Sequence, residues 1–105
     1  MNDCIFCKII NRTIPAKIVY EDDEMVAFHD IQPKADIHYL IIPKLHIESM
    51  LKLEDKHSNL LGNILVKINK IALDHKLEGY KLTIHTGEKG GQEVFHLHIH
   101  LLANR

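Results

Sequence analysis

The alternation of apolar and polar positions along the chain predicts two helices. The clearer one covers residues 55–76, where apolar residues recur with i, i+3, i+4, i+7 spacing and Lys67 and Lys70 fall on the other side. Gly79 provides the expected stop after it. A shorter helix is expected over residues 5–11. The apolar stripe of the long helix consists of Leu61, Ile64, Leu65, Ile68, Ile71 and Ala72.

The same pattern predicts strands on both sides of the long helix. Two strands near the start flank an acidic turn and form an expected hairpin. A third, mostly apolar strand is expected to be central and to end at Pro43. The order of elements predicts an α+β fold with a five-stranded antiparallel sheet, one long helix and a short N-terminal helix. The predicted strands cover residues 18–20, 25–31, 38–42, 80–86 and 94–102.

Composition narrows the class of protein. A length of 105 residues suits one domain over residues 1–105. Because 13 Lys and Arg residues meet 14 Asp and Glu residues, the chain lacks the basic surplus that favours binding to nucleic acid or membranes. No apolar run approaches the ~20 residues that span a bilayer, and the start resembles no secretory signal. Two cysteines exclude a framework of several disulfides. We therefore expect a cytoplasmic protein with neither nucleic acid nor membrane as partner.

Three of the nine histidines alternate within the last predicted strand. Because strand side chains alternate between faces, His96, His98 and His100 line one face, while the aliphatic residues between them face the long helix. One interpretation is a metal site, since imidazole is a common zinc ligand. The three residues could not easily share one ion, because the Cα atoms of His96 and His100 lie roughly 13 Å apart on a strand.

Phosphate chemistry is the other interpretation of the histidine row. One imidazole would attack phosphorus while its neighbours donate protons to phosphoryl oxygens. The preceding turn supports this, because Gly87, Gly90 and Gly91 let the backbone approach a ligand and offer N–H groups as an anion-binding nest. The chain has neither a P-loop motif nor the glycine motif of dinucleotide-binding proteins, which excludes both classes.

The histidine row also resembles the signature of the histidine triad (HIT) family, in particular of its Hint branch. The segment from His96 to Leu102 fits the pattern His-φ-His-φ-His-φ-φ, in which φ is apolar. Further landmarks similar to that branch occur in order at residues 4–10, 14–15, 28–31, 42–46 and 90–94. The resemblance implies a HIT-like fold, a homodimer and a hydrolase that cleaves purine nucleoside phosphoramidates, such as AMP linked to an amine. The implied ligands are AMP or GMP derivatives.

The resemblance also implies roles for individual residues. His98 would attack the α-phosphorus and form a nucleotidyl-histidine intermediate that water resolves, with His100 and His96 completing the catalytic set. Asp30 would bind the ribose hydroxyls, and His85 would donate to the phosphate or the leaving group. The phosphate would also meet Gly91, Gln92, Glu93 and Val94, and an apolar base pocket would consist of Ile5, Phe6, Ile9, Phe28 and Ile31.

Three features depart from the Hint pattern. His85 stands where asparagine is usual, which implies a new pH dependence, and Glu93 stands where serine is common. Five residues follow His100, where Hint hydrolases carry a longer tail that shapes the choice of leaving group. Two alternatives therefore stay open. One is a dinucleoside polyphosphate hydrolase or nucleotidyl transferase that uses the same His98 intermediate, and the other is a purine nucleotide-binding adaptor with incidental turnover.

No cofactor is expected for catalysis, but the resemblance implies a structural zinc. Some bacterial HIT proteins bind zinc through a Cys-x-x-Cys pair and two histidines, which here fall on Cys4, Cys7, His46 and His96. Such a Cys₂His₂ set suits tetrahedral zinc. The cysteine spacing alone would also fit a redox-active or an inert pair. The other histidines, at positions 29, 38, 57 and 75, are expected to be surface or packing residues.

Overall fold

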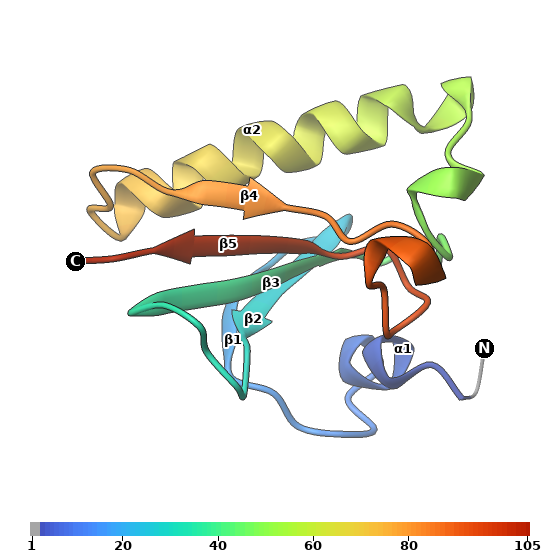
Figure 1. Ribbon diagram of the computed structural model, residues 1–105, viewed down its shortest axis with the longest axis horizontal. Coiled ribbons are helices and arrows are strands. Elements are labelled where there is room, and N and C mark those ends of the chain that lie inside the picture. Colours follow the sequence, from blue (N-terminus) through green and yellow to red (C-terminus); the bar gives the residue numbers. More distant parts are fainter. Residues whose placement is uncertain (1–2) are drawn as a thin grey trace.

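A computed structural model of the chain describes residues 3–105 and contains a five-stranded sheet between two helices of unequal length (Figure 1). Neighbouring strands all pair antiparallel, in the order β1-β2-β3-β5-β4. The α+β fold predicted from the sequence is thereby confirmed. The elements are α1 (Ile5–Ile10), β1 (Ile18–Glu21), β2 (Met25–His29), β3 (Ile37–Pro43), α2 (Ser58–Asp74), β4 (Lys81–Thr83) and β5 (Ile99–Ala103), with single 3₁₀ turns η1 (Met50–Lys52), η2 (Asp55–His57) and η3 (Glu88–Gly90).

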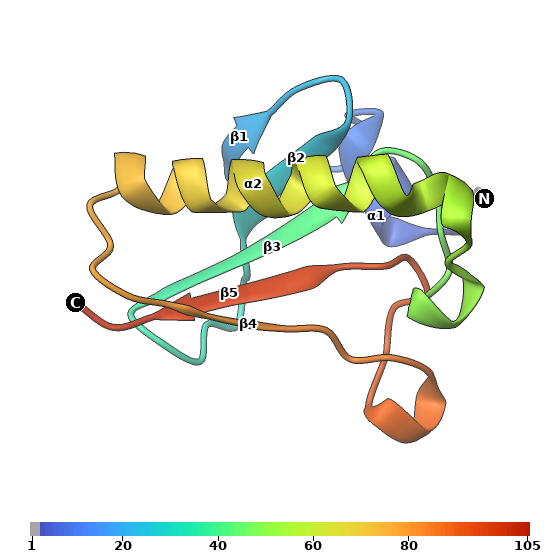
Figure 2. The same ribbon diagram turned by 90° about the horizontal axis from the view of Figure 1, so that it is seen from above.

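The long helix α2 covers one face of the sheet and forms the main core with it, and Figure 2 shows the helix running along the strands. Ile64, Ile68, Ile71 and Ala72 of the predicted stripe are buried there against side chains of β2, β3 and β5. Each buried large aliphatic side chain contributes about 1.5–3 kcal/mol. Leu65, which the spacing assigns to the same stripe, is 47% exposed, because it lies on the solvent side of Ile64.

The ends of α2 differ from the prediction. The first predicted turn is the separate 3₁₀ element η2. At the other end Lys76 adopts φ +60°, and the N–H groups of Lys76 and Leu77 donate to the carbonyls of Leu73 and Ala72. This Schellman arrangement closes the helix, so Gly79 is not its stop. No helix within residues 3–105 is long and apolar enough to cross a membrane.

A hairpin turn between β1 and β2 holds α2 in place. Asp22 in the turn accepts hydrogen bonds from the N–H groups of Glu24 and Met25. The Lys67 ammonium lies 2.7 Å from the carboxylate of Asp22 and 2.8 Å from that of Glu24. Lys67 therefore ties the helix to the sheet, whereas the sequence pattern places it on the solvent side.

The short helix α1 lies against the opposite face of the sheet (Figure 1). Phe6 and Ile9 of this helix pack on Phe28 and Leu40 in a second apolar cluster. The Phe6 and Phe28 rings meet edge to face, with centroids 5.7 Å apart. Because α1 is only 6 residues long, it covers part of this face and leaves the rest to polar side chains.

The last strand is shorter than predicted, since β5 starts at Ile99 and not at residue 94. Its ladder with β3 begins where Ile41 meets Ile99, close to the end of β3. Before that point the chain runs free of the ladder, and the Leu97 N–H donates to the carbonyl of Ile47. His96 and His98 therefore precede the strand that contains His100.

Candidate active site and metal centre

The three alternating histidines lie in three different environments. His96 is fully buried, His98 is 7% exposed, and His100 is partly buried. His98 and His100 line a cleft of about 310 Å³ on the face opposite α2, whereas His96 does not reach it. Backbone groups near these rings fix their tautomers, because a carbonyl only accepts a hydrogen bond and an N–H only donates one.

The ring of His98 presents an unprotonated nitrogen to the cleft. Its Nδ1 lies 2.7 Å from the backbone oxygen of His96, so Nδ1–H donates and Nε2 keeps its lone pair. The Phe6 ring packs against it in a T-shaped contact, with centroids 5.0 Å apart. Burial lowers the pKa of His98 below the ordinary 6.5, so the ring stays neutral at neutral pH. A neutral and oriented imidazole of this kind suits nucleophilic attack.

A chain of hydrogen bonds fixes the ring of His100 in the other tautomer. The backbone N–H of Lys34 donates to Nδ1 of His38 over 3.1 Å, so the proton of His38 lies on Nε2. That Nε2 lies 3.0 Å from Nδ1 of His100 and 3.4 Å from a carboxylate oxygen of Asp30. His100 therefore carries its proton on Nε2, a buried atom without a hydrogen-bond partner within residues 3–105. Burial and the neighbouring histidines lower the pKa of His100 to about 4.

His38 is a site residue that the sequence analysis missed. The pattern assigns it to the surface or to packing, but its ring is 4% exposed and contacts His100. In β3 it pairs with Leu102 of β5, which brings it to the face that carries His100. Its alternation with Leu40, which faces away from α2, is the signal that could have revealed it. His75, by contrast, packs as expected and is hydrogen-bonded to the Tyr39 hydroxyl.

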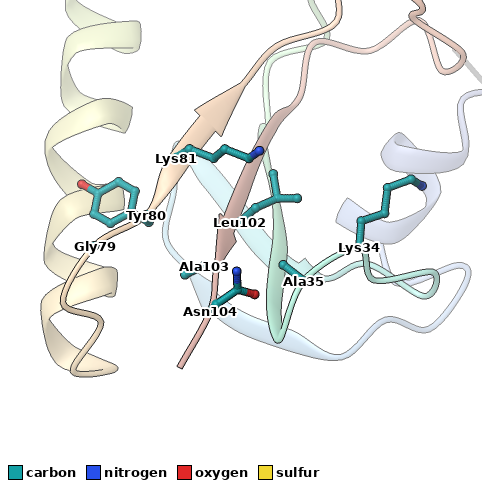
Figure 3. Close-up of a pocket in the computed structure, with 8 residues that line it drawn as sticks. All are labelled: Lys34, Ala35, Gly79, Tyr80, Lys81, Leu102, Ala103 and Asn104. Carbon is teal, nitrogen blue, oxygen red and sulfur yellow. The ribbon is translucent and has the colours of Figure 1, made fainter.

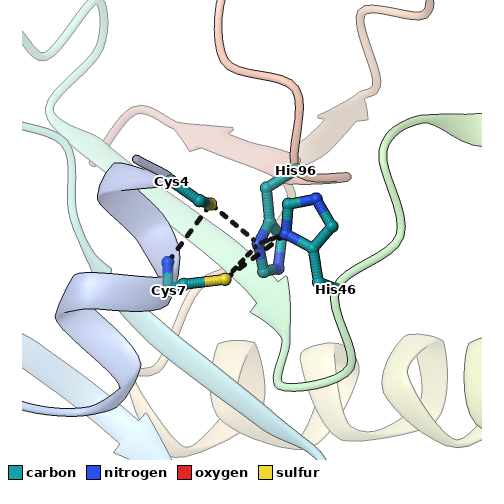
Figure 4. Close-up of side chains that lie close together, drawn as sticks. All are labelled: Cys4, Cys7, His46 and His96. Atoms are coloured by element: carbon teal, nitrogen blue, oxygen red, sulfur yellow. Dashed lines mark hydrogen bonds between the residues drawn. The ribbon is translucent and has the colours of Figure 1, made fainter. Parts of the chain in front are cut away.

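The four residues of the predicted zinc set converge at one point between α1 and the loop after β3 (Figure 4). Nδ1 of His96 lies 3.3 Å from Sγ of Cys4, 3.7 Å from Sγ of Cys7 and 3.1 Å from Nδ1 of His46. A tetrahedral zinc separates its nitrogen and sulfur ligands by roughly 3.3–3.8 Å. The two nitrogen–sulfur distances lie in this range and the nitrogen–nitrogen distance is slightly shorter, so the set is close to the geometry of this ion.

The tautomer of His96 also suits a metal ligand. Its Nε2–H donates to the carbonyl oxygen of Pro43 over 2.8 Å, and this leaves Nδ1 unprotonated and aimed at the two sulfurs. Burial lowers the pKa of His96 to about 4, which favours the neutral ring. Burial and the Cys4 thiol raise the pKa of Cys7 to about 11, so zinc binding there releases a proton. His96 was expected both in the catalytic set and as a metal ligand, and this geometry favours the role of a ligand in a structural metal centre between α1 and the sheet.

Asp30, His38 and His100 form a second cluster, with ligand-type atoms within 4.8 Å of one another. This cluster does not suit a metal. Nδ1 of His38 already accepts the Lys34 N–H, so a metal on Nε2 would leave the imidazole with no proton on either nitrogen. Metal-binding histidines instead donate their second N–H to an acceptor. The cluster is therefore a proton-carrying chain that ends in the cleft.

The glycine-rich turn does not offer the expected nest of N–H groups. The N–H groups of Gly90 and Gln92 donate to the carbonyl of Gly87, and that of Gly91 donates to Glu88. The Gln92 side chain accepts from the Gly87 N–H and donates to two loop carbonyls. Gly87 and Gly91 have φ of +72° and +87°, so glycine is needed for this tight turn. The side chain of Gln92 thus braces the loop, and its expected contact with phosphate stays a prediction.

The rim of the cleft next to this turn offers other donors. Gly91, Glu93 and Val94 line it. The N–H groups of Glu93 and Val94 meet no acceptor in the described part of the chain. The exposed ring of His85 stands beside His100, with centroids 4.9 Å apart. These groups, and not the glycine N–H groups, are open to a bound phosphate.

An apolar cavity of about 730 Å³ lies beside α1 on the same face of the sheet. All the residues expected to form a base pocket line it, namely Ile5, Phe6, Ile9, Phe28 and Ile31. Ile31 stands at the rim and is 94% exposed. Asp30 lines both this cavity and the histidine cleft, and one of its oxygens accepts the Gln32 N–H. Its carboxylate therefore lies between an apolar pocket and the histidines.

Known proteins are similar to this chain in sequence and in fold. The family described as "Scavenger mRNA decapping enzyme C-term binding" matches residues 3–105. Protein HitA of Neisseria gonorrhoeae is 52% identical over 103 residues, covering 97% of this chain and 96% of that protein. A "14 kDa zinc-binding protein" of Brassica juncea is 41% identical over 106 residues, covering 98% and 94%. The crystal structure of a HIT family hydrolase from Legionella pneumophila matches with a TM-score of 0.95 and 47% identity, covering 98% and 94%.

The chain therefore belongs to the HIT family, and the HIT-like fold expected from the histidine row is confirmed. The convergence of the Cys₂His₂ set and the name of the Brassica relative support the expected structural zinc. Membership of the Hint branch stays a prediction.

Proposed function

We propose that this protein is a Hint-type hydrolase that cleaves purine nucleoside phosphoramidates through a nucleotidyl-histidine intermediate. The observation that carries the proposal is a pair of opposite tautomers in one cleft. The ring of His98, with a free Nε2, stands next to the ring of His100, whose buried Nε2–H has no partner within residues 3–105, and the two ring centroids are 5.2 Å apart. One nitrogen can attack phosphorus while the other donates to a phosphoryl oxygen. The hydrolase name of the Legionella structure supports hydrolysis.

Nucleotide binding follows from the surroundings of this pair. The purine occupies the apolar cavity beside α1, and the Asp30 carboxylate accepts hydrogen bonds from the ribose hydroxyls. The phosphate then reaches His98 and meets the N–H groups of Glu93 and Val94, with His85 at the rim. The cavity supplies apolar burial and the carboxylate supplies orientation, which is the usual division in a small-molecule site.

The reaction proceeds in two displacements. In the first, the Nε2 lone pair of His98 forms a bond to phosphorus, and the P–N bond of the substrate breaks. Its electron pair leaves with the amine, which takes up a proton from solvent at the open end of the cleft. In the second, water attacks phosphorus, its proton passes to solvent, and the N–P bond breaks to restore His98 and release AMP. His100 donates to the phosphoryl oxygen in both steps.

Trapping the intermediate tests this proposal. After mixing with an adenosine phosphoramidate and rapid quenching, mass spectrometry should detect an acid-sensitive, base-stable AMP adduct on His98. The His98→Ala protein should form no adduct but still bind AMP, because Asp30 and the apolar cavity are unchanged. The His100→Ala protein should form the adduct more slowly. An adduct on another residue, or full turnover by His98→Ala, would refute the assignment. Binding of AMP by the wild-type protein without turnover would favour the adaptor alternative.

We also propose that the chain forms one HIT domain over residues 1–105 and works as a homodimer in the cytoplasm. Two features support the dimer. The edge strand β4 has an unpaired side, and α2 exposes Leu65, Val66 and Leu73 by 47%, 58% and 63%. Free thiols at Cys4 and Cys7 suit a reducing compartment. Light scattering should give the mass of two chains at micromolar concentration, and the mass of one chain would contradict the dimer.

A further inference from the structure

A second cavity, here called the outer cavity, adjoins the histidine cleft. It measures about 380 Å³ and shares three lining residues with the cleft, Lys34, Lys81 and Leu102. Figure 3 shows Lys81 on β4 and Lys34 on the loop before β3, on either side of Leu102. Within residues 3–105, these lysines are the only charged side chains that line it, whereas the histidine cleft is also lined by Asp30 and Glu93. The apolar cavity and the outer cavity therefore adjoin the same cleft and differ sharply in charge.

Strand register and a backbone bond place both lysines next to the histidines. Lys81 of β4 pairs with Leu102 of β5, which pairs with His38 of β3, so these three side chains share the face opposite α2. Lys34 is anchored by its own N–H, which donates to Nδ1 of His38. Burial is the main cause that lowers the pKa of His38, while the Asp30 carboxylate raises it and the Lys34 ammonium lowers it. The charge of Lys34 therefore acts on the cleft against that of Asp30.

Neither lysine has a counter-ion in the part of the chain that the structure describes. By contrast, Lys44 and Lys67 pair with carboxylates around the β1–β2 hairpin. Two unpaired ammonium groups on opposite sides of one cavity create a positive potential that attracts anions and repels cations. Because the nucleoside end of the substrate fills the apolar cavity, the positive outer cavity faces whatever is attached on the far side of the phosphorus.

We propose that the group leaving from phosphorus carries a negative charge, as a carboxylate or a phosphate, and that Lys34 and Lys81 select it in the outer cavity. This inference rests on the proposed function and names its substrate class. The preferred substrates are thus AMP linked to an acidic amine or to a further phosphate. Amines that keep a second positive charge are disfavoured.

Three matched phosphoramidates test the charge preference. They join AMP to γ-aminobutyrate, to its amide and to putrescine, which have similar length and carry a negative, a neutral and a positive end. We expect kcat/KM to fall roughly tenfold from the first to the last, and the difference to shrink at high salt. An AMP conjugate of aminopropyl phosphate and a diadenosine polyphosphate distinguish a carboxylate from a phosphate as the preferred anion.

Lysine variants locate the preference. The double variant Lys34→Gln/Lys81→Gln should bring the three compounds within about twofold, and Lys34→Glu/Lys81→Glu should favour the putrescine compound. Lys56→Gln, in η2, removes the same charge away from the cleft and both cavities and should keep the wild-type preference. Equal kcat/KM values in the wild-type protein, or a preference that survives the double variant, would overturn the inference.

Equilibrium binding separates this inference from the proposed function. Dissociation constants of the three compounds are measured with the His98→Ala protein, which cannot form the covalent intermediate. The γ-aminobutyrate compound should bind tightest, and the lysine double variant built on His98→Ala should lose the difference. If the three dissociation constants follow the expected order but the wild-type protein shows no turnover, the proposed hydrolase activity is refuted and the anion site is kept. If the wild-type protein turns the compounds over but the three dissociation constants do not differ, the anion site is refuted and the hydrolase activity is kept.

Discussion

His96 and His38 are both buried histidines with one ring nitrogen hydrogen-bonded to the backbone, yet they belong to opposite kinds of site. The carbonyl of Pro43 accepts from Nε2–H of His96 and leaves Nδ1 bare for a metal. The N–H of Lys34 donates to Nδ1 of His38 and keeps the proton on Nε2. One backbone group therefore decides whether the other nitrogen binds a cation or donates a proton.

The surroundings of the two histidine clusters match this difference. The zinc cluster adds two thiols and links α1, the loop after β3 and the segment before β5, so its metal acts on stability. The phosphate-side cluster adds a carboxylate and ends in a cleft, with a donor already oriented before substrate arrives. We therefore expect that a substitution in one cluster impairs either zinc binding or turnover but not both, although His96 and His98 lie two residues apart on one segment.

The largest expected effect comes from His98→Ala. Loss of the nucleophile should lower turnover of an adenosine phosphoramidate at least about a thousandfold. Zinc content should stay at one equivalent, because the His98 ring is not in the zinc set. Steady-state hydrolysis and elemental analysis of the same samples measure both. The matched variant His57→Ala removes a histidine outside the cleft and should keep both turnover and zinc content. Loss of zinc from the His98→Ala protein would contradict the view that the two histidine clusters act independently.

Removal of a zinc ligand tests the role of the metal centre in stability. Cys7→Ser should abolish zinc binding and lower the free energy of unfolding by about 4 kcal/mol at free zinc a thousandfold above its dissociation constant. The His98 adduct should still form at temperatures where the variant is folded. Thermal unfolding with and without a chelator measures the loss in the wild-type protein. Under a tenth of an equivalent of zinc in wild-type protein purified without chelator would rule out the zinc site.

His38→Ala is expected to have a smaller effect, on chemistry alone. Without the His38 donor, Nδ1 of His100 has no fixed partner and the ring populates the wrong tautomer, so kcat should fall roughly a hundredfold. Zinc content should not change. Because His38 acts through His100, His38→Gln, which keeps an amide donor, should recover part of the rate. A loss of zinc or of folded protein, in place of a loss of kcat, would show a structural role.

The pH dependence of turnover gives the smallest expected effect. Burial disfavours the charged ring, so His100 has a lowered pKa of about 4 and stays neutral well below the ordinary value of 6.5. Once His100 is protonated, its Nδ1 and the Nε2 of His38 both carry protons, so the hydrogen bond between the two rings is lost. We therefore expect kcat/KM to hold from neutral pH down past 6.5 and to fall at lower pH, once either the nucleophile His98, whose pKa burial also lowers, or His100 becomes protonated. An acid limb centred at 6.5 or above would show that the cluster is solvated.

Several features of the site could be predicted from the sequence because they depend on local spacing. Alternation places His98 and His100 on one face, and the Cys4-x-x-Cys7 pair lies within one helical turn. The glycine turn was also visible, but its role was not. Its N–H groups donate hydrogen bonds to the Gln92 side chain and to carbonyls of the same loop. These bonds depend on the folded conformation of the loop, which the sequence pattern does not specify.

The α+β fold, the order of its elements and the residue types of both clusters follow from the sequence, because hydrophobic periods of 3.6 and 2 residues can be recognised along it. The tautomer of each buried histidine, in contrast, depends on contacts that form only in the folded chain. The partner of each ring nitrogen comes from another segment in three cases: Pro43 for His96, Lys34 for His38 and His38 for His100. The hydrogen-bond partner of one ring nitrogen determines which nitrogen carries the proton. Because that partner comes from a distant segment, the spacing of residues along the chain does not predict the tautomer.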